Sequence, residues 1–160
     1  MPLTTVSDLA EMLKAKGKRL SLAESCTGGL IASKMTSIPG SSAYFLGSAV
    51  TYSNESKESV LGVRHSTLLG YGAVSEETAR EMALGSLKAY CSDIAASVTG
   101  IAGPDGGTEE KPVGTVWMAV TDGKNTVVKE NHFSGTRDEI RKKSTETLID
   151  LICAFAGGKT

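Results

Sequence analysis

A serine beside a pair of glycines is the first feature of the sequence that could carry out chemistry. The segment 24–29 reads Glu-Ser-Cys-Thr-Gly-Gly and follows a short apolar stretch. A serine at the point where a strand turns into a helix faces free backbone N–H groups, which can hold an oxyanion or a phosphate. The same pattern fits a glycine-rich turn in which Ser25 or Thr27 only caps the helix, so the segment alone leaves both interpretations open.

A serine hydroxyl becomes an effective nucleophile only when a neighbouring base removes its proton. The two histidines, His65 and His132, lie in segments typical of surface or structural residues, and the sequence has no GxSxG motif. Lys57 is the alternative base, because it falls in the first turns of an expected helix, where the dipole lowers the pKa of an amine and burial would lower it further. Tyr52 precedes Lys57 in the sequence, and its hydroxyl could relay a proton. The competing interpretation is that Lys57 is a solvated lysine on a surface helix.

A second glycine-rich loop, residues 99–107, also follows an apolar strand. Glycines let a ligand approach the backbone closely, but the loop contains neither GxxxxGK nor GxGxxG, so a plain tight connection fits equally well. Arg137 and Arg141 stand four residues apart at the start of the expected last helix. Either arginine could clamp a phosphate, or both could lie on an exposed helix face.

Alternating strands and helices must position these residues. The apolar patterns and caps predict helices over 6–13, 28–36 and 76–90, a short helix that Ser53 or Asn54 caps, and a last helix from 136 to 155. They predict strands over 19–23, 44–52, 94–99, 113–120 and 126–133, the last two joined by a hairpin at Asp122-Gly123. We therefore expect an α/β three-layer sandwich: a mixed, mostly parallel sheet of about five strands, helices on both faces and a late β-hairpin.

The bulk composition limits the classes of function. The 160 residues fit one domain over 1–160, and a net charge of -1 with 5% aromatic residues argues against a nucleic-acid partner. With no signal-peptide pattern and no apolar run long enough for a membrane span, we expect a cytoplasmic protein. Three widely spaced cysteines give neither a disulfide framework nor a metal pair, so we expect a reducing compartment and no metal.

Six segments together resemble the nicotinamide-mononucleotide deamidases, a family that includes the C-terminal domain of the CinA proteins. They are AESCTGG, GSAVTYSNESK, GAVSEETAREMA, SVTGIAGPDGG, KPVGTVWMAV and FSGTRDEIR, in this order. The resemblance runs from about residue 7 to residue 154. It implies hydrolysis of the carboxamide of nicotinamide mononucleotide to nicotinate mononucleotide and ammonia, in NAD salvage, by a homo-oligomer without a cofactor.

The resemblance also assigns roles to residues. It makes Ser25 the nucleophile with Tyr52 and Lys57 as its activating partners, and it places an oxyanion hole at the amides of Cys26, Thr27 and Gly28. A further set matches substrate-binding positions: Glu24, Asn54, Thr99, Gly100, Gly103 and Arg137. Of these, Glu24 and Asn54 could instead orient their neighbours.

Two departures and two alternatives stand beside this interpretation. Asp105 and Glu109 occupy expected variable loop positions, and CinA proteins carry a large N-terminal domain that the 160 residues do not include, so we do not expect that domain's activity. Cys26 is a rival nucleophile, because it neighbours Ser25 near an expected helix N-terminus. A nucleotide-binding module without turnover is the alternative from a different functional class.

Overall fold

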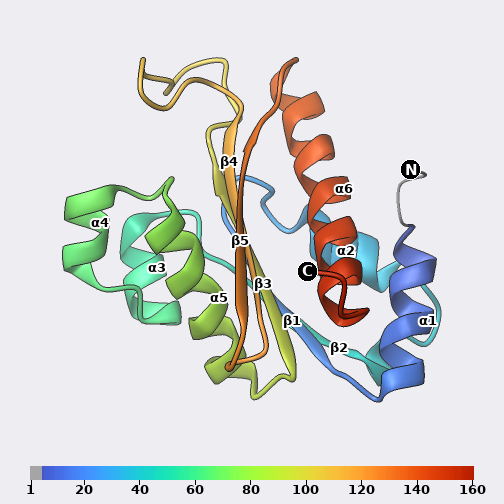
Figure 1. Ribbon diagram of the computed structural model, residues 1–160. Helices are drawn as coiled ribbons and strands as arrows, with labels where there is room; N and C mark the ends of the chain where they lie inside the picture. Colours follow the sequence, from blue (N-terminus) through green and yellow to red (C-terminus); the bar gives the residue numbers. More distant parts are fainter. Residues whose placement is uncertain (1–4) are drawn as a thin grey trace.

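The computed structural model describes residues 5–160 and is built around one five-stranded sheet (Figure 1). The strands are β1 (Leu20–Glu24), β2 (Phe45–Val50), β3 (Ile94–Gly100), β4 (Thr115–Thr121) and β5 (Thr126–His132). Their order across the sheet is β2-β1-β3-β4-β5. β1 pairs in parallel with β2 and β3, whereas β4 runs antiparallel to both β3 and β5. The predicted mixed sheet and late hairpin are confirmed.

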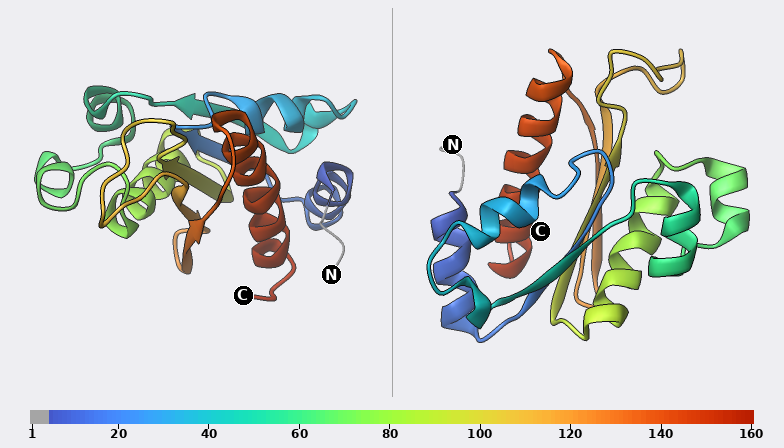
Figure 2. Two further views of the ribbon diagram at one scale, coloured as in Figure 1. Left: turned by 90° about the horizontal axis from the view of Figure 1, so that it is seen from above. Right: turned by 180° about the vertical axis from the view of Figure 1, so that it is seen from behind.

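Helices cover both faces of the sheet, which confirms the predicted three layers (Figures 1 and 2). One face carries α1 (Val6–Lys16), α2 (Leu30–Thr36) and α6 (Arg137–Ala156), and the other carries α3 (Asn54–Leu61), α4 (His65–Tyr71) and α5 (Glu76–Tyr90). A short 3₁₀ turn, η1 (Ser41–Ala43), precedes β2. Among residues 5–160, no helix combines the length and the apolar character that a membrane crossing requires.

The core follows the alternation of side chains along the buried strands. Leu22 packs with Met118 and Leu148 in the larger apolar cluster, on the side of α1, α2 and α6. The next residue, Ala23, belongs to a second cluster with Met82, on the side of α5. Successive strand residues point to opposite faces, so β1 connects the two cores and lies at the centre of the molecule.

Local backbone geometry shifts two predicted boundaries. The helix expected from Gly28 begins only at Leu30, because Gly28 and Gly29 have φ angles of 59° and 98°, in the left-handed region. The strand expected from residue 113 begins at Thr115, after Gly114 with φ of 95°. The short helix α4 was not predicted, since its sequence offers no side-chain cap at its N-terminus.

The sheet brings three chain segments to one edge. Glu24, the last residue of β1, pairs with Val50 of β2 and Val98 of β3. The residues that follow these parallel strands therefore emerge together at their carboxyl ends, where open α/β sheets bind ligands.

Replacing Leu22 by alanine tests the central position of β1. Leu22 is fully buried, so we expect the Leu22→Ala variant to lose about 2–5 kcal/mol of unfolding free energy in urea titrations. Leu69, which is 76% exposed, provides the matched control, and Leu69→Ala should change stability by less than about 0.5 kcal/mol. Equal losses in the two variants would contradict this core.

Candidate active site

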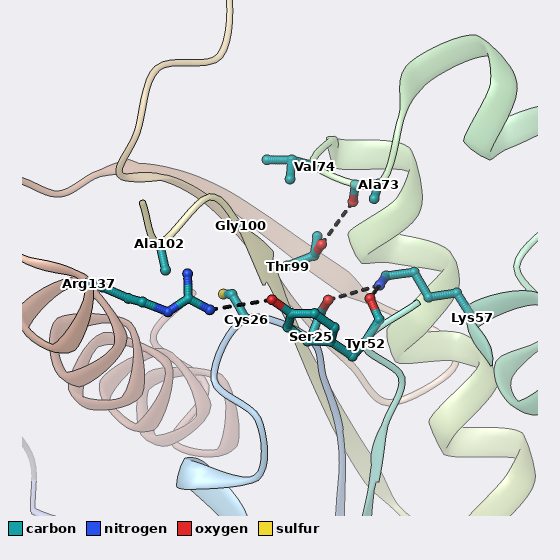
Figure 3. Close-up of a pocket in the computed structure, with 10 residues that line it drawn as sticks. All are labelled: Ser25, Cys26, Tyr52, Lys57, Ala73, Val74, Thr99, Gly100, Ala102 and Arg137. Carbon is teal, nitrogen blue, oxygen red and sulfur yellow. Dashed lines mark hydrogen bonds between the residues drawn. The ribbon is translucent and has the colours of Figure 1, made fainter. Parts of the chain in front are cut away.

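A pocket of about 230 Å³ opens at the carboxyl edge of β1, β2 and β3 (Figure 3). Its lining comes from five separate stretches of chain: Ser25, Cys26, Tyr52, Lys57, Ala73, Val74, Thr99, Gly100, Ala102 and Arg137. The two segments that the sequence singled out, around Ser25 and around Thr99, thus meet in one cavity together with Lys57.

Lys57 reaches Ser25 from the first turns of α3. Its Nζ lies 2.8 Å from Ser25 Oγ and also donates to the backbone carbonyls of Thr51, at 2.7 Å, and Tyr52, at 3.2 Å. The side chain of Ser53 caps α3 by accepting from the Ser56 amide, which fixes the helix that carries the lysine. Two main-chain carbonyls therefore hold the amine beside the serine hydroxyl.

Burial changes the acid–base behaviour of this lysine. Lys57 is 1% exposed, and loss of hydration disfavours its charged form. Burial lowers the pKa of Lys57 from 10.5 to about 8. The sequence predicted this direction from the dipole of α3 and from burial, and desolvation is the main cause in the structure. An amine with this pKa can be neutral near physiological pH and so can act as a base.

Tyr52 and Arg137 meet at the open side of the pocket. The phenol of Tyr52 is exposed and accepts from Arg137 Nη2 at 3.4 Å, as Figure 3 shows. Arg137 Nη1 donates to the carbonyl of Gly103 at 2.7 Å. Tyr52 therefore contacts Lys57 through its carbonyl and Arg137 through its hydroxyl, and Gly103 acts by holding the arginine rather than by lining the cavity.

Thr99 and Gly100, at the end of β3, form another wall of the pocket (Figure 3). The Thr99 hydroxyl donates to the Ala73 carbonyl at 2.9 Å, which leaves its oxygen lone pairs directed away from that bond. A Cβ on Gly100 would lie 2.6 Å from a methyl of Val116, so only glycine fits between this wall and β4. Asn54, in contrast, is exposed at the start of α3 and does not line the pocket.

Glu24 organises the loop from inside the molecule. It is fully buried, and its carboxylate accepts hydrogen bonds from the Gly29, Ile31 and Ala32 amides. The hydroxyls of Thr27 and Ser48 donate to it as well. Glu24 has no surface left for a substrate, so of the two roles that the resemblance implies only the orienting one fits.

The amides after Ser25 differ in their availability. Gly28 N–H donates to the Ser25 carbonyl at 3.1 Å and closes a turn, so it is already engaged. Within the described part of the chain, the Cys26 and Thr27 amides donate to no other residue. Thr27 is fully buried, whereas Cys26 lines the pocket. Of the three expected oxyanion donors, the Cys26 amide is the one that borders the cavity.

The other candidate nucleophile and bases, which are Cys26 and the two histidines, have an unfavourable pKa or lie outside the pocket. Burial raises the pKa of the Cys26 thiol to about 11, which opposes formation of a thiolate. His65 contacts Glu58 and His132 contacts Glu130, both on exposed side chains outside the pocket. Over residues 5–160, no group of three acidic, histidine or cysteine side chains is arranged to hold a metal ion.

Sequence patterns missed several contributors. Ala73 and Val74 line the pocket from the loop before α5, where the sequence patterns predicted no site residue. Thr51 contributes through its backbone carbonyl, which accepts from Lys57, so the type of its side chain does not predict this contact. Main-chain contacts of this kind depend on how the strands align, so they cannot be predicted from residue types.

A comparison with protein families gives a clear match over nearly the whole chain. Residues 3–155 match the family described as the CinA C-terminal domain. This chain belongs to that family. A curated relative, the nicotinamide-nucleotide amidohydrolase PncC of Escherichia coli K12, is 51% identical over 145 residues, which are 90% of this chain and 88% of the relative.

Longer relatives also match. The CinA-like protein of Endomicrobium trichonymphae is 54% identical over 93% of this chain, and that of Syntrophomonas wolfei is 52% identical over the same share. The chain spans about a third of the length of these two proteins, at 35% and 36%.

Solved structures share the fold. A CinA superfamily protein from Klebsiella pneumoniae superposes with a TM-score of 0.93 at 33% identity, covering 96% of each chain. A competence/damage-inducible protein from Agrobacterium tumefaciens gives 0.88 at 41% identity, covering 96% of this chain and 98% of that one.

Substituting Glu24 tests whether its carboxylate holds the loop. A glutamine has one acceptor oxygen in place of two and turns an N–H₂ group toward groups that themselves donate. We expect Glu24→Gln to lower the unfolding free energy by about 3 kcal/mol or more, because buried donors lose a charged partner. Glu109→Gln, on an exposed loop, is the control. A Glu24→Gln variant as stable as this control would refute the role.

Proposed function

We propose that this protein hydrolyses the carboxamide of nicotinamide mononucleotide to nicotinate mononucleotide and ammonia, with Ser25 as nucleophile and Lys57 as its base. The observation that carries the proposal is the 2.8 Å contact between Lys57 Nζ and Ser25 Oγ inside a pocket. The name and the 51% identity of the amidohydrolase relative support this substrate. A pocket used only for binding would not require a buried amine at a serine.

The lysine contacts suit a neutral base. A neutral amine has two N–H bonds and one lone pair, and the Thr51 and Tyr52 carbonyls can accept the two N–H bonds. The lone pair is then directed at Ser25 Oγ, from which it takes the proton as the oxygen attacks the carboxamide carbon. Tyr52 orients the base through its carbonyl in this scheme, and its phenol stays with Arg137.

The turn after Ser25 receives the developing negative charge. In our proposal the Cys26 amide donates to the oxyanion, and the Thr27 amide lies deeper in the same turn. Removing a donor of this kind raises the activation barrier by about 2.7–4 kcal/mol in known enzymes. Gly28 supports the turn through its bond to the Ser25 carbonyl rather than by direct donation.

Proton return completes the cycle. The ammonium of Lys57 protonates the departing nitrogen, ammonia leaves, and an acyl ester remains on Ser25. Water then attacks this ester while Lys57 again accepts a proton. Lys57 returns that proton to Ser25 Oγ as the ester bond breaks, which releases nicotinate mononucleotide and regenerates the hydroxyl. The positive pyridinium ring withdraws electrons from the carboxamide and makes it more reactive than an ordinary amide.

The remaining pocket residues bind the substrate in this proposal. The Thr99 oxygen can accept from the carboxamide N–H₂, because its own proton is committed to Ala73. Arg137 stands at the open side with donors beyond the two already in use, which suits the substrate phosphate. Gly100 gives the ring close access to the backbone.

The cellular setting stays a prediction. We place the reaction in cytoplasmic NAD salvage, with a homo-oligomer as the working form and no nucleic-acid partner. Free Cys26, Cys91 and Cys153 are compatible with a reducing compartment.

Ammonia release from nicotinamide mononucleotide tests the activity and the nucleophile together. We expect the wild type to release ammonia, Ser25→Ala to lose at least about 10³-fold in kcat, and Cys26→Ala to keep most of it. Binding without ammonia release in the wild type would favour a non-catalytic nucleotide module. Loss of turnover only in Cys26→Ala would reassign the nucleophile.

The pH dependence tests the base. Since burial holds the pKa of Lys57 at about 8, the amine is charged and inactive below that pH and neutral above it. We expect kcat/KM to rise about tenfold per pH unit on the acid side and to level off above the pKa. Lys57→Arg, which stays protonated, should be nearly inactive. The control Lys88→Arg, on the exposed end of α5, should keep the wild-type profile; a flat wild-type profile would count against Lys57.

A further inference from the structure

Arg141 of α6 reaches the turn that follows the nucleophile. Its Nε donates to the carbonyl of Cys26 at 3.1 Å, and its Nη2 donates to the carbonyl of Thr27 at 3.1 Å. A Cβ on Gly28 would lie 3.4 Å from the same guanidinium, so the turn rests directly on the arginine. One side chain, from a helix more than a hundred residues away in sequence, therefore contacts two consecutive residues of the turn and closes the space beside the third.

These contacts restrain two of the peptide planes in the turn. The turn from Ser25 to Gly28 contains three peptide units, and the first is held by the Gly28 amide on the Ser25 carbonyl. Arg141 holds the second and third through their carbonyls. Among the described residues, the Cys26 carbonyl accepts from Arg141 alone, whereas the Thr27 carbonyl also accepts from the Leu30 amide.

A held carbonyl also fixes an amide. In a planar trans peptide the N–H points opposite to the C=O, so a Cys26 carbonyl turned toward Arg141 directs the Thr27 N–H away from the guanidinium. Glu24 binds the other end of the loop through Gly29 and the first amides of α2. The guanidinium thus holds the turn and the carboxylate holds the residues that follow it, both on the C-terminal side of the Cys26 amide.

We infer that Arg141 is a positioning residue that sets the oxyanion-binding turn after Ser25, and not a ligand of the substrate phosphate. The inference rests on the proposed amide hydrolysis and adds to it the side chain that holds the two peptide units directly after the Cys26 amide, and with them the Gly28 amide that binds the Ser25 carbonyl. A displacement of about 1 Å in such groups can cost about 10²-fold in rate, so their support matters for turnover.

The engagement of Arg141 argues against the phosphate role that its spacing from Arg137 suggested. Two of its nitrogens already donate to protein carbonyls, and Nη1 lies 4.0 Å from Asp138 Oδ1. Arg141 is absent from the lining of the catalytic pocket, where Arg137 is present. Arg141 therefore lies outside the cavity in which the proposal places the substrate.

The test compares Arg141→Met with Lys142→Met. Both remove one cation from adjacent positions of α6, but the exposed Lys142 does not contact the turn. Each variant is assayed with nicotinamide mononucleotide and with nicotinamide riboside, which has the same carboxamide and no phosphate. Backbone amide NMR signals of Thr27 and Gly28 give a second measurement that does not depend on turnover.

We expect Arg141→Met to lower kcat about 10- to 100-fold on both substrates while KM stays nearly unchanged, because a transition-state contact is lost. The Thr27 and Gly28 signals should shift, and added guanidinium chloride should restore part of the rate where sodium chloride at equal ionic strength does not. Lys142→Met should match the wild type in all of these measurements.

Two results would overturn the inference. A rise in KM for the mononucleotide alone would make Arg141 a phosphate ligand, and an unchanged kcat with unmoved amide signals would leave it without a role in the turn. A wild type that releases no ammonia would instead refute the proposed function. The amide signals then decide alone: if they stay in place in Arg141→Met, the arginine does not set the turn.

Discussion

An amine buried without a carboxylate partner is the constraint on which the site depends. Lys57 Nζ has three hydrogen-bond partners, two carbonyls and the hydroxyl of Ser25, and none carries a negative charge. No charged partner therefore offsets the loss of hydration, and the neutral form of the lysine is favoured. The same burial that makes this arrangement costly for an ammonium makes the amine a usable base beside a serine.

The sheet supplies the alignment that this contact requires. Glu24, Val50 and Val98 lie side by side on β1, β2 and β3, so the nucleophile loop, the Tyr52 segment and the Thr99 wall leave the sheet at one level. The helix α6 then adds Arg137 at the open side of the pocket and Arg141 at the turn. Residues from both ends of the chain thus converge on one short turn.

Sequence patterns predicted the elements well and the contacts unevenly. The cap at Ser53 and the hairpin at Asp122 follow from local chemistry, and the structure confirms them. The predicted start of α2 was wrong, because Gly28 and Gly29 adopt left-handed backbone conformations and the helix begins only after them.

Long-range consequences were harder to foresee from the sequence. The buried position of Glu24 and the use of Arg141 on backbone carbonyls depend on packing between distant elements, which no residue type reveals. The extent of burial at Lys57, which is the main cause of its pKa shift, has the same origin.

The pKa of Lys57 itself is the most direct test, read from the pH dependence of its side-chain ¹³Cε and ¹⁵Nζ NMR signals in the intact protein. A titration near pH 8 is the predicted result. A titration near 10.5, the ordinary value, would mean that the amine stays charged beside Ser25 and would contradict the account.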